Sequence, residues 1–214
     1  MSLYGELPTV LLDSGEEVRG VRVRVPNPPK LAILRLPTSQ EMLDRLDQQK
    51  SIRRTLGRRK SQTEFVPNPK ADLDLFNKIR LDKGAEFDEF EAGNAISKLT
   101  YNEVTDCERT GEEYRITLRT PFGDTVHQMS IPTQRDITIY RRTVVSATDL
   151  PHGQEELRYR IQPSVELYDA VAASIQGYAA SMKPADVPPH HKSAVVVDLV
   201  QAIDDLDPPM DPNS

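Results

Sequence analysis

The stretch YNEVTDCERTGEEYRITLRTPFGDTVHQMS, residues 101–130, decides the fold class. Three strand candidates lie in it or reach one residue beyond it: 101–108, 113–120 and 125–131. Two turn sequences join them: Arg109-Thr110-Gly111 and Pro121-Phe122-Gly123-Asp124. Glycine and proline favour the backbone angles of tight turns, so successive strands with these links predict an antiparallel β-meander.

A hairpin is predicted at residues 9–25, where a short apolar run leads into the turn sequence Asp13-Ser14-Gly15. Valines alternate with arginines from Val21 to Val25, which places the valines on one face of a strand. The prolines that follow end this strand, because proline cannot donate to a ladder. We therefore expect an α+β fold in which the hairpin and the meander form one antiparallel sheet, with helices packed on one face.

Apolar periodicity, caps and breakers predict the remaining elements. Helices are expected from Thr38 to Gly57 and at 71–82, 87–99, 133–142, 164–182 and 193–206. Further strands are expected at 31–36 and 156–162. Loops are expected at 61–70 and through Pro151 and Gly153.

Three of the predicted helices begin with the same local sequence. Thr38, Thr133 and Ser164 each follow a proline at the end of a predicted strand, and each has an acidic residue two or three positions later. The hydroxyl accepts a hydrogen bond from a free helix N–H, and the acid favours the positive end of the helix dipole. These three residues are therefore predicted N-caps.

The domain organisation follows from the prolines near the C-terminus. The expected parts are a main domain at 1–182 with a sub-boundary near 60–70, a linker at 183–192, and a helix with an acidic tail at 193–214. The last helix has four apolar residues on one face: Val196, Leu199, Val200 and Ile203. Aspartates near its C-terminus oppose the helix dipole, so this helix needs a surface to pack on. We predict that the four residues bind in the groove of a protein partner.

The composition excludes several classes of protein. The 214 residues include one cysteine, which rules out an internal disulfide framework and a cysteine-rich zinc site. The apolar runs are far shorter than the roughly 20 residues of a membrane span. The N-terminus lacks the basic and apolar regions of a secretory signal. We therefore expect a soluble intracellular chain with no membrane partner.

The charge is unevenly distributed along the chain. Residues 1–60 contain 12 basic and 7 acidic side chains, whereas residues 61–214 contain 15 basic and 26 acidic ones. The whole chain has a net charge of −6. This asymmetry predicts a basic face at one end and an acidic tail at the other, and it allows head-to-tail attraction between copies.

No common catalytic or nucleotide-binding motif is present, which argues against an enzyme and predicts no cofactor. The adjacent His190 and His191 supply too few ligands for a metal site. His127 is interpreted as a cross-strand partner and Cys107 as a structural residue beside Asp106 and Glu108. An enzyme whose active site is assembled from residues far apart in the sequence is kept as the third hypothesis, after the two given below.

A basic cluster is the sharpest local feature. Its members are Arg53, Arg54, Arg58, Arg59 and Lys60. Positive charge stabilises a helix C-terminus, so part of the cluster needs no ligand. The other interpretations are a plain solvated face, contact with an acidic protein partner and contact with phosphates of a nucleic acid.

The segment LAILRLPTSQEMLDRLDQQKSIRRTLGRR, residues 31–59, resembles the opening of the tail assembly chaperones of tailed bacteriophages. Members of that family often begin with a short strand, a Pro-Thr turn and a charged helix. Residues 71–142 are similar to the remainder of a phage structural or assembly protein. The resemblance implies a non-enzymatic role in holding a partner or joining an ordered assembly, in the cytoplasm or the virion, and it carries over no catalytic residue.

The leading hypothesis is therefore a non-enzymatic phage assembly or virion protein that acts through protein–protein contacts with a partner or with its own copies. The alternative is a nucleic-acid-associated protein that uses the basic cluster.

Overall fold

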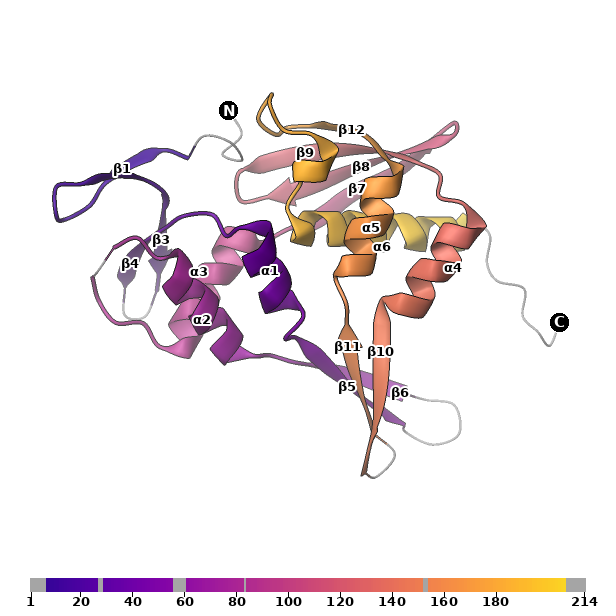
Figure 1. Cartoon of the computed structure of the whole chain (residues 1–214), viewed down its shortest axis with the longest axis horizontal. Helices are drawn as coiled ribbons and strands as arrows, with labels where there is room; N and C mark the ends of the chain where they lie inside the picture. Colours follow the sequence, from indigo (N-terminus) through magenta and orange to yellow (C-terminus); the bar gives the residue numbers. More distant parts are fainter. Residues whose placement is uncertain (1–6, 27–28, 56–60, 83, 152–153, 207–214) are drawn as a thin grey trace.

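The computed structural model describes residues 7–26, 29–55, 61–82, 84–151 and 154–206. Within these residues it has six α-helices and twelve strands, and the strands form four small antiparallel sheets. The predicted α+β class is confirmed. Figure 1 shows an N-terminal unit of helices and hairpins, a C-terminal unit of a sheet with helices, and a four-stranded sheet that projects below both.

The N-terminal unit has its own apolar core. Its elements are β1 (Thr9–Leu11), β2 (Glu17–Arg19), β3 (Val21–Val25), β4 (Lys30–Leu34), α1 (Ser39–Leu46), α2 (Pro69–Ile79) and α3 (Glu89–Thr100). The fully buried side chains of Val25, Leu34, Phe76 and Ile96 meet between the β3–β4 pair and the helices. Local alternation predicted this correctly, because Val23 and Val25 are buried while the arginines between and beside them are exposed.

The region of the predicted hairpin contains strands of two separate hairpins. β1 pairs with β2 through the turn that contains Gly15, whose φ is +85°, and β3 pairs with β4. Neither pair joins the meander, so the single sheet that we expected is divided among separate sheets.

The C-terminal unit is built on the meander, which is confirmed. Its elements are β7 (Glu103–Thr110), β8 (Glu113–Thr120), β9 (Gly123–Ser130), α4 (Gln134–Thr143), α5 (Gln162–Val171), β12 (Ala172–Gln176), the 3₁₀ turn η2 (Pro184–Asp186) and α6 (Pro189–Leu206). The strand order is β12-β9-β8-β7. Ile116, Leu118 and Met129 point from the sheet into a core shared with Tyr168 and Leu199 on α5 and α6.

The third part, which we call the arm sheet, consists of two hairpins from distant parts of the chain. Its strands are β5 (Lys50–Thr55), β6 (Ser61–Val66), β10 (Val145–Leu150) and β11 (Gln154–Tyr159). Their order is β10-β11-β5-β6. The helix predicted from Thr38 to Gly57 ends instead at Leu46, and the loops predicted at 61–70 and before Gly153 contain strands. Pairing between β5 and β11 supplies hydrogen bonds that local sequence cannot indicate.

The helix predicted at 164–182 is also too long. α5 ends at Val171, and the next five residues form β12, which pairs with β9. This pairing gives the backbone of β9 a partner on its second side. Ile175 and Tyr178, the apolar residues of the predicted helix that lie beyond α5, still pack against the C-terminal core. Ile175 does so from β12, and Tyr178 from the segment after it.

Two of the three predicted N-caps are confirmed. Thr38 and Thr133 each form a capping box with the acidic residue three positions later. Ser164 instead lies inside the first turn of α5 and is buried; the helix begins after Ile161 without a side-chain cap.

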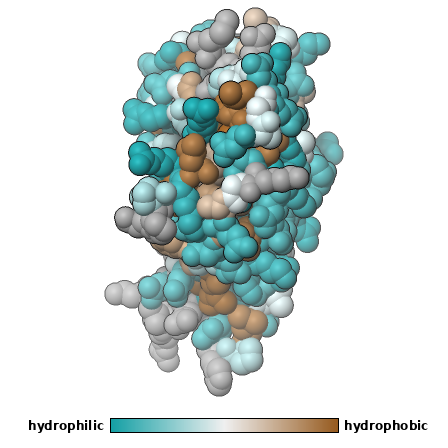
Figure 2. All heavy atoms as spheres, turned by 90° about the vertical axis from the view of Figure 1, so that its left-hand side faces the viewer, coloured by the Kyte–Doolittle hydropathy of each residue, from teal (hydrophilic) through white to brown (hydrophobic). Residues whose placement is uncertain are grey.

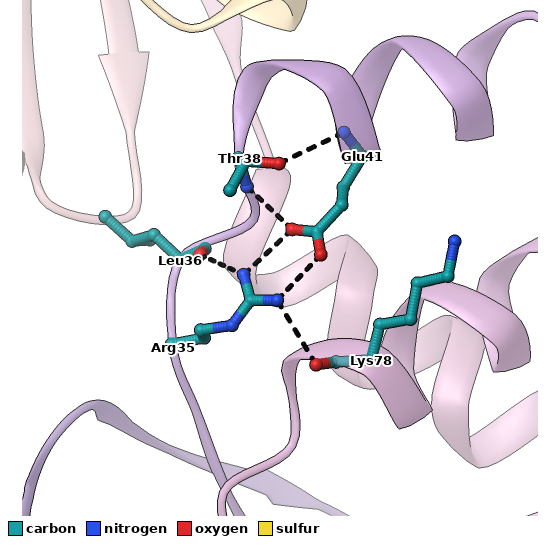
Figure 3. A network of polar contacts seen from close by, with 5 residues as sticks. All are labelled: Arg35, Leu36, Thr38, Glu41 and Lys78. Carbon is teal, nitrogen blue, oxygen red and sulfur yellow. Dashed lines mark hydrogen bonds and ion pairs between the residues drawn. The ribbon is translucent and has the colours of Figure 1, made fainter.

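The capping box of α1 belongs to a network that joins three elements (Figure 3). The guanidinium of Arg35 donates to both carboxylate oxygens of Glu41, at 2.8 and 2.7 Å. It also donates to the carbonyl oxygens of Leu36 and Lys78, at 3.0 and 3.2 Å. The hydrogen bonds with Arg35 and the backbone N–H of Thr38 hold the pKa of Glu41 at about 2. The network fixes the start of α1 against the end of α2.

Glu41→Gln tests the charge of this network. Glutamine keeps the capping box but loses the charge-assisted pair with Arg35, so we expect the free energy of unfolding at pH 7 to fall by about 1 kcal/mol. Urea unfolding measures this difference. The control is Asp44→Asn on the exposed side of α1, for which we expect a change below about 0.5 kcal/mol. An equal loss in both variants would contradict the assigned role of Arg35.

Candidate functional sites: the arm sheet and a buried histidine cluster

The register of the arm sheet places the large apolar residues Leu157, Phe65 and Tyr159 on one face, which they share with the ion pair of Arg53 and Glu155. Leu157 is opposite Ala147 on one side and Ser51 on the other, and Ser51 is opposite Phe65. Tyr159 lies two residues from Leu157 and therefore shares its face. Leu157 is buried, whereas Phe65 is 54 % exposed and Tyr159 is 44 % exposed. We call this surface the apolar face of the arm sheet.

The apolar face has little cover. Figure 1 shows the arm sheet projecting away from both helical units. Figure 2, viewed from the N-terminal side, shows surface hydrophobic side chains at the height of the arm sheet, surrounded by hydrophilic ones. The outer strands β6 and β10 each have one edge without a partner strand among the described residues. Uncovered sheet faces and open edges are typical of surfaces that bind other chains.

The opposite face of the arm sheet, which we call the charged face, carries charged pairs beside the half-buried Ile52, Val66 and Leu150. The ammonium of Lys50 lies 2.9 Å from a carboxylate oxygen of Glu156, and the guanidinium of Arg158 lies 2.7 Å from the other. These two bases lower the pKa of Glu156. Since the pairs are partly exposed, they contribute little to stability and serve mainly to keep this face hydrophilic.

The two described members of the basic cluster, Arg53 and Arg54, lie on the arm sheet and not at the end of a helix. Arg53 is on β5, where its Nε donates to Glu155 at 2.6 Å, and Arg54 is opposite Gln154. Arg58, Arg59 and Lys60 lie outside the described residues. The prediction that the basic cluster stabilises the C-terminus of a helix ending near Gly57 is wrong, because α1 ends at Leu46. By sequence, the segments 50–66 and 145–159 contain seven basic and four acidic residues, so the arm is basic and the remainder of the chain is strongly acidic.

The four residues predicted to bind a partner groove face the chain's own core. Val196 and Leu199 are fully buried, Val200 is 8 % exposed, and Ile203 packs partly buried against them. α6 packs against α5, β7 and β8, so it completes the C-terminal unit. The segment predicted as a linker, 183–192, is also part of the C-terminal unit, because it contains η2 and the first turn of α6. An apolar stripe on a helix indicates that this face is covered. It does not indicate whether the chain's own core or a partner protein covers it.

The C-terminal core contains a cluster of polar side chains that the sequence did not predict. His127 on β9 lies 2.7 Å from the hydroxyl of Tyr168 through Nδ1 and 3.1 Å from Thr125 Oγ1 through Nε2. The hydroxyl of Tyr178 lies 3.3 Å from the same Nε2 and 2.8 Å from Nδ1 of His191 on α6. The cluster therefore joins the sheet, α5, α6 and the segment after β12.

His190 extends this cluster toward the N-terminal unit. Its ring centroid lies 4.4 Å from that of His191. The residue is 9 % exposed, and both ring nitrogens are buried without a hydrogen-bond partner. His190 also lines a cleft of about 260 Å³ between the two units. A buried unpaired polar group costs about 1–3 kcal/mol, so this residue is unusual in a folded core.

Burial controls the ionisation of the three histidines. It lowers the pKa of His127 to about 4, that of His190 to about 3 and that of His191 to about 2. All three imidazoles are therefore neutral at pH 7. Because a neutral imidazole has one donor and one acceptor, the cluster provides directed hydrogen bonds without charge. The adjacent histidines of the sequence were the only local signal of this site.

Metal and nucleophile chemistry find little support in the described residues. No group of three or more His, Cys, Asp or Glu side chains in that part of the chain is arranged to hold a metal ion. Burial, with Asp198 and Asp106 nearby, raises the pKa of the Cys107 thiol to about 11. The thiolate that a nucleophile needs is thus scarce at neutral pH.

Comparison with known proteins adds no relative. No protein-family model, curated protein or solved structure matches this chain. Among the described helices, none combines the length and the hydropathy of a membrane span; even α6, with 18 residues, contains Lys192 and three aspartates. The fold and the two sites therefore define an α+β protein with a projecting sheet.

Proposed function

We propose that this chain is a non-enzymatic assembly or structural protein whose copies bind one another through the arm sheet. The observation that carries the proposal is the apolar face of the arm sheet, where exposed Phe65 and Tyr159 flank buried Leu157. An aromatic residue at the centre of a protein contact often supplies a large share of its binding energy. A second chain that covers this face removes both rings from water.

Charge favours a second copy as the partner. The arm segments have three more basic than acidic residues, whereas the remainder of the chain has nine more acidic than basic ones. An arm sheet that meets the acidic part of the next copy brings unlike charges together, and this arrangement is head to tail. Such contacts form rings when the rotation closes and filaments when it does not.

The resemblance of residues 31–59 to tail assembly chaperones supports the same class of function. The short strand β4, the Thr38 cap and α1 follow the order of elements that this resemblance implies. We accordingly place the protein in phage assembly or in the virion. The alternative function is nucleic-acid binding by the basic cluster; the basic arm favours it, while the pairing of Lys50 and Arg53 with carboxylates removes two of the free charges.

Phe65→Asp tests the assembly surface against Gln62→Asp as a matched control. Both variants add one negative charge to β6, but the register places Gln62 on the charged face. We expect the wild-type chain to form oligomers that weaken at high salt, Phe65→Asp to weaken them by about 30-fold or more, and Gln62→Asp to retain them. Light scattering coupled to size exclusion, across a concentration series, measures the three chains.

Two results would contradict the proposal. A wild-type chain that stays monomeric at low salt would exclude self-assembly, and equal loss of oligomers in both variants would exclude the apolar face. Retention of a DNA or RNA duplex at low salt, lost when Arg53 and Arg54 become alanine, would instead support the alternative function.

A further inference from the structure

The cleft between the N-terminal and C-terminal units is a separate feature from the arm sheet. Its volume is about 260 Å³. The apolar part of its lining comes from both units: Leu36, Pro37, Met42 and Leu99 from one, and Met182, Pro188 and Pro189 from the other. Clefts at the junction of two units, lined mainly by apolar side chains with a few polar groups, are the usual form of small-molecule sites.

Apart from the exposed Ser39, the other polar side chains around the cleft are engaged inside the chain. Thr38 Oγ1 accepts from the N–H of Glu41, Thr100 Oγ1 donates to the carbonyl of Ile96, and a carboxylate oxygen of Asp186 accepts from the N–H of Lys183. No Lys or Arg side chain lines the cleft within the part of the chain that the structure describes. The lining therefore offers no positive charge to pair with an anionic ligand, and its one carboxylate, Asp186, is already held by a backbone N–H.

His190 is the buried polar group of this lining whose ring nitrogens have no hydrogen-bond partner among the described residues. Both of its ring nitrogens are shielded from solvent, and neither is hydrogen-bonded to a described residue. Buried polar atoms in folded proteins almost always have partners in protein, in water or in a ligand. Neither nitrogen is exposed to the cleft in the structure, so binding needs a turn of the imidazole about its Cβ–Cγ bond that brings one of them to the cleft.

We propose that this cleft binds a small neutral molecule that is mainly apolar and has a single amide-like group. This group forms a hydrogen bond with the imidazole of His190. A cavity of about 150 Å³ holds benzene, so this cleft has room for a ligand of roughly ten non-hydrogen atoms. The amide is favoured because it has both a donor and an acceptor, so one of its groups can pair with a ring nitrogen of the neutral imidazole whichever nitrogen carries the proton. The proposal stands whether or not the arm sheet assembles copies.

The methionines of the chain allow a direct test with two probes of equal size. Benzamide and isopropylbenzene have the same number of non-hydrogen atoms, but only benzamide carries an amide. Met42 and Met182 line the cleft, whereas Met129 lies buried in the C-terminal core and is absent from the lining. In the full chain labelled with ¹³C-methyl methionine, we expect benzamide to shift the signals of Met42 and Met182 and to leave Met129 unchanged.

His190→Leu separates the hydrogen bond from the apolar cleft. Leucine removes the unpaired ring and keeps the site apolar, so the variant is expected to fold. We expect the affinity for benzamide, relative to isopropylbenzene, to fall by about tenfold. If the variant does not fold, ¹⁵N signals of the His190 ring in the wild-type chain give the same test, since benzamide should shift them and isopropylbenzene should not.

Three results would overturn the proposal. If neither probe shifts the signals of Met42 or Met182 up to its solubility limit, the cleft binds no such ligand. If the signal of Met129 shifts as much as the other two, the binding is non-specific. If the ratio of the two affinities is the same in the wild-type chain and in His190→Leu, His190 is not part of the site.

Discussion

Acidification from pH 7.5 to pH 5 is expected to remove about 6 kcal/mol of stability, enough to unfold the C-terminal unit of a protein of ordinary stability. The three buried histidines His127, His190 and His191 have pKa values of about 4, 3 and 2 in the folded chain. In the unfolded chain each returns to about 6.5. Below pH 6.5 the unfolded chain therefore binds up to three protons that the folded chain does not.

The sign follows from that difference in bound protons. Stability rises with pH wherever the unfolded chain binds more protons, so it is nearly complete at about pH 7.5 and falls as the pH is lowered through 6.5. Three groups give a slope of about 4 kcal/mol per pH unit near pH 5. Protonation of Glu41 adds its own loss only below about pH 4.5, because its folded pKa is about 2. The raised pKa of Asp198 acts in the opposite direction and reduces the total.

Urea unfolding at pH 7.5, 6.0 and 5.0, followed by circular dichroism, measures this slope. His190→Leu is the matched control, because it removes one of the three titrating groups and should reduce the slope to about two thirds of its value. The same stability at pH 7.5 and pH 5.0 would show that the imidazoles are not buried as neutral groups.

The parts of the fold that the sequence predicted are those governed by neighbours along the chain. Thr38 and Thr133 cap helices through hydrogen bonds that span three residues, and the meander is joined by turns of a few residues. The apolar faces of α2, α3 and α6 also follow from local periodicity. Each of these interactions is determined within a single turn, hairpin or helix, so residue order is enough to indicate it.

The parts that were missed depend on residues far apart in the sequence. The ion pair between Arg53 and Glu155 spans 102 positions, so nothing near the basic cluster predicted that its first members lie on a strand. The hydrogen bond between His127 and Tyr168 spans 41 positions, and that between Tyr178 and His127 spans 51. Single residues of this kind show no period, so the histidine cluster becomes visible only when the fold brings β9, α5 and α6 together.

Gly177 holds β12 against β9 and is expected to be among the least tolerant positions in the chain. Its φ of +83° lies in the left-handed region, and a Cβ added there would lie 2.5 Å from the carbonyl oxygen of Asp124 and 3.0 Å from Cα of Thr125. Both atoms belong to the backbone of β9, so the contact can be relieved only if the strands move apart. Such a movement also displaces Tyr178, the next residue, from His127 and His191.

Gly177→Ala is therefore expected to lower the free energy of unfolding by about 3–4 kcal/mol, from the left-handed backbone together with the steric contact. Gly111→Ala is the matched control: its φ of +67° is also left-handed, but a Cβ there meets nothing within 4 Å. We expect it to cost about 1 kcal/mol. Urea and thermal unfolding at pH 7.5 compare the two, with a melting temperature roughly 10 °C lower for Gly177→Ala. Equal costs in the two variants would mean that β12 can shift without strain, and the close approach of Gly177 to β9 would then have no role in positioning Tyr178.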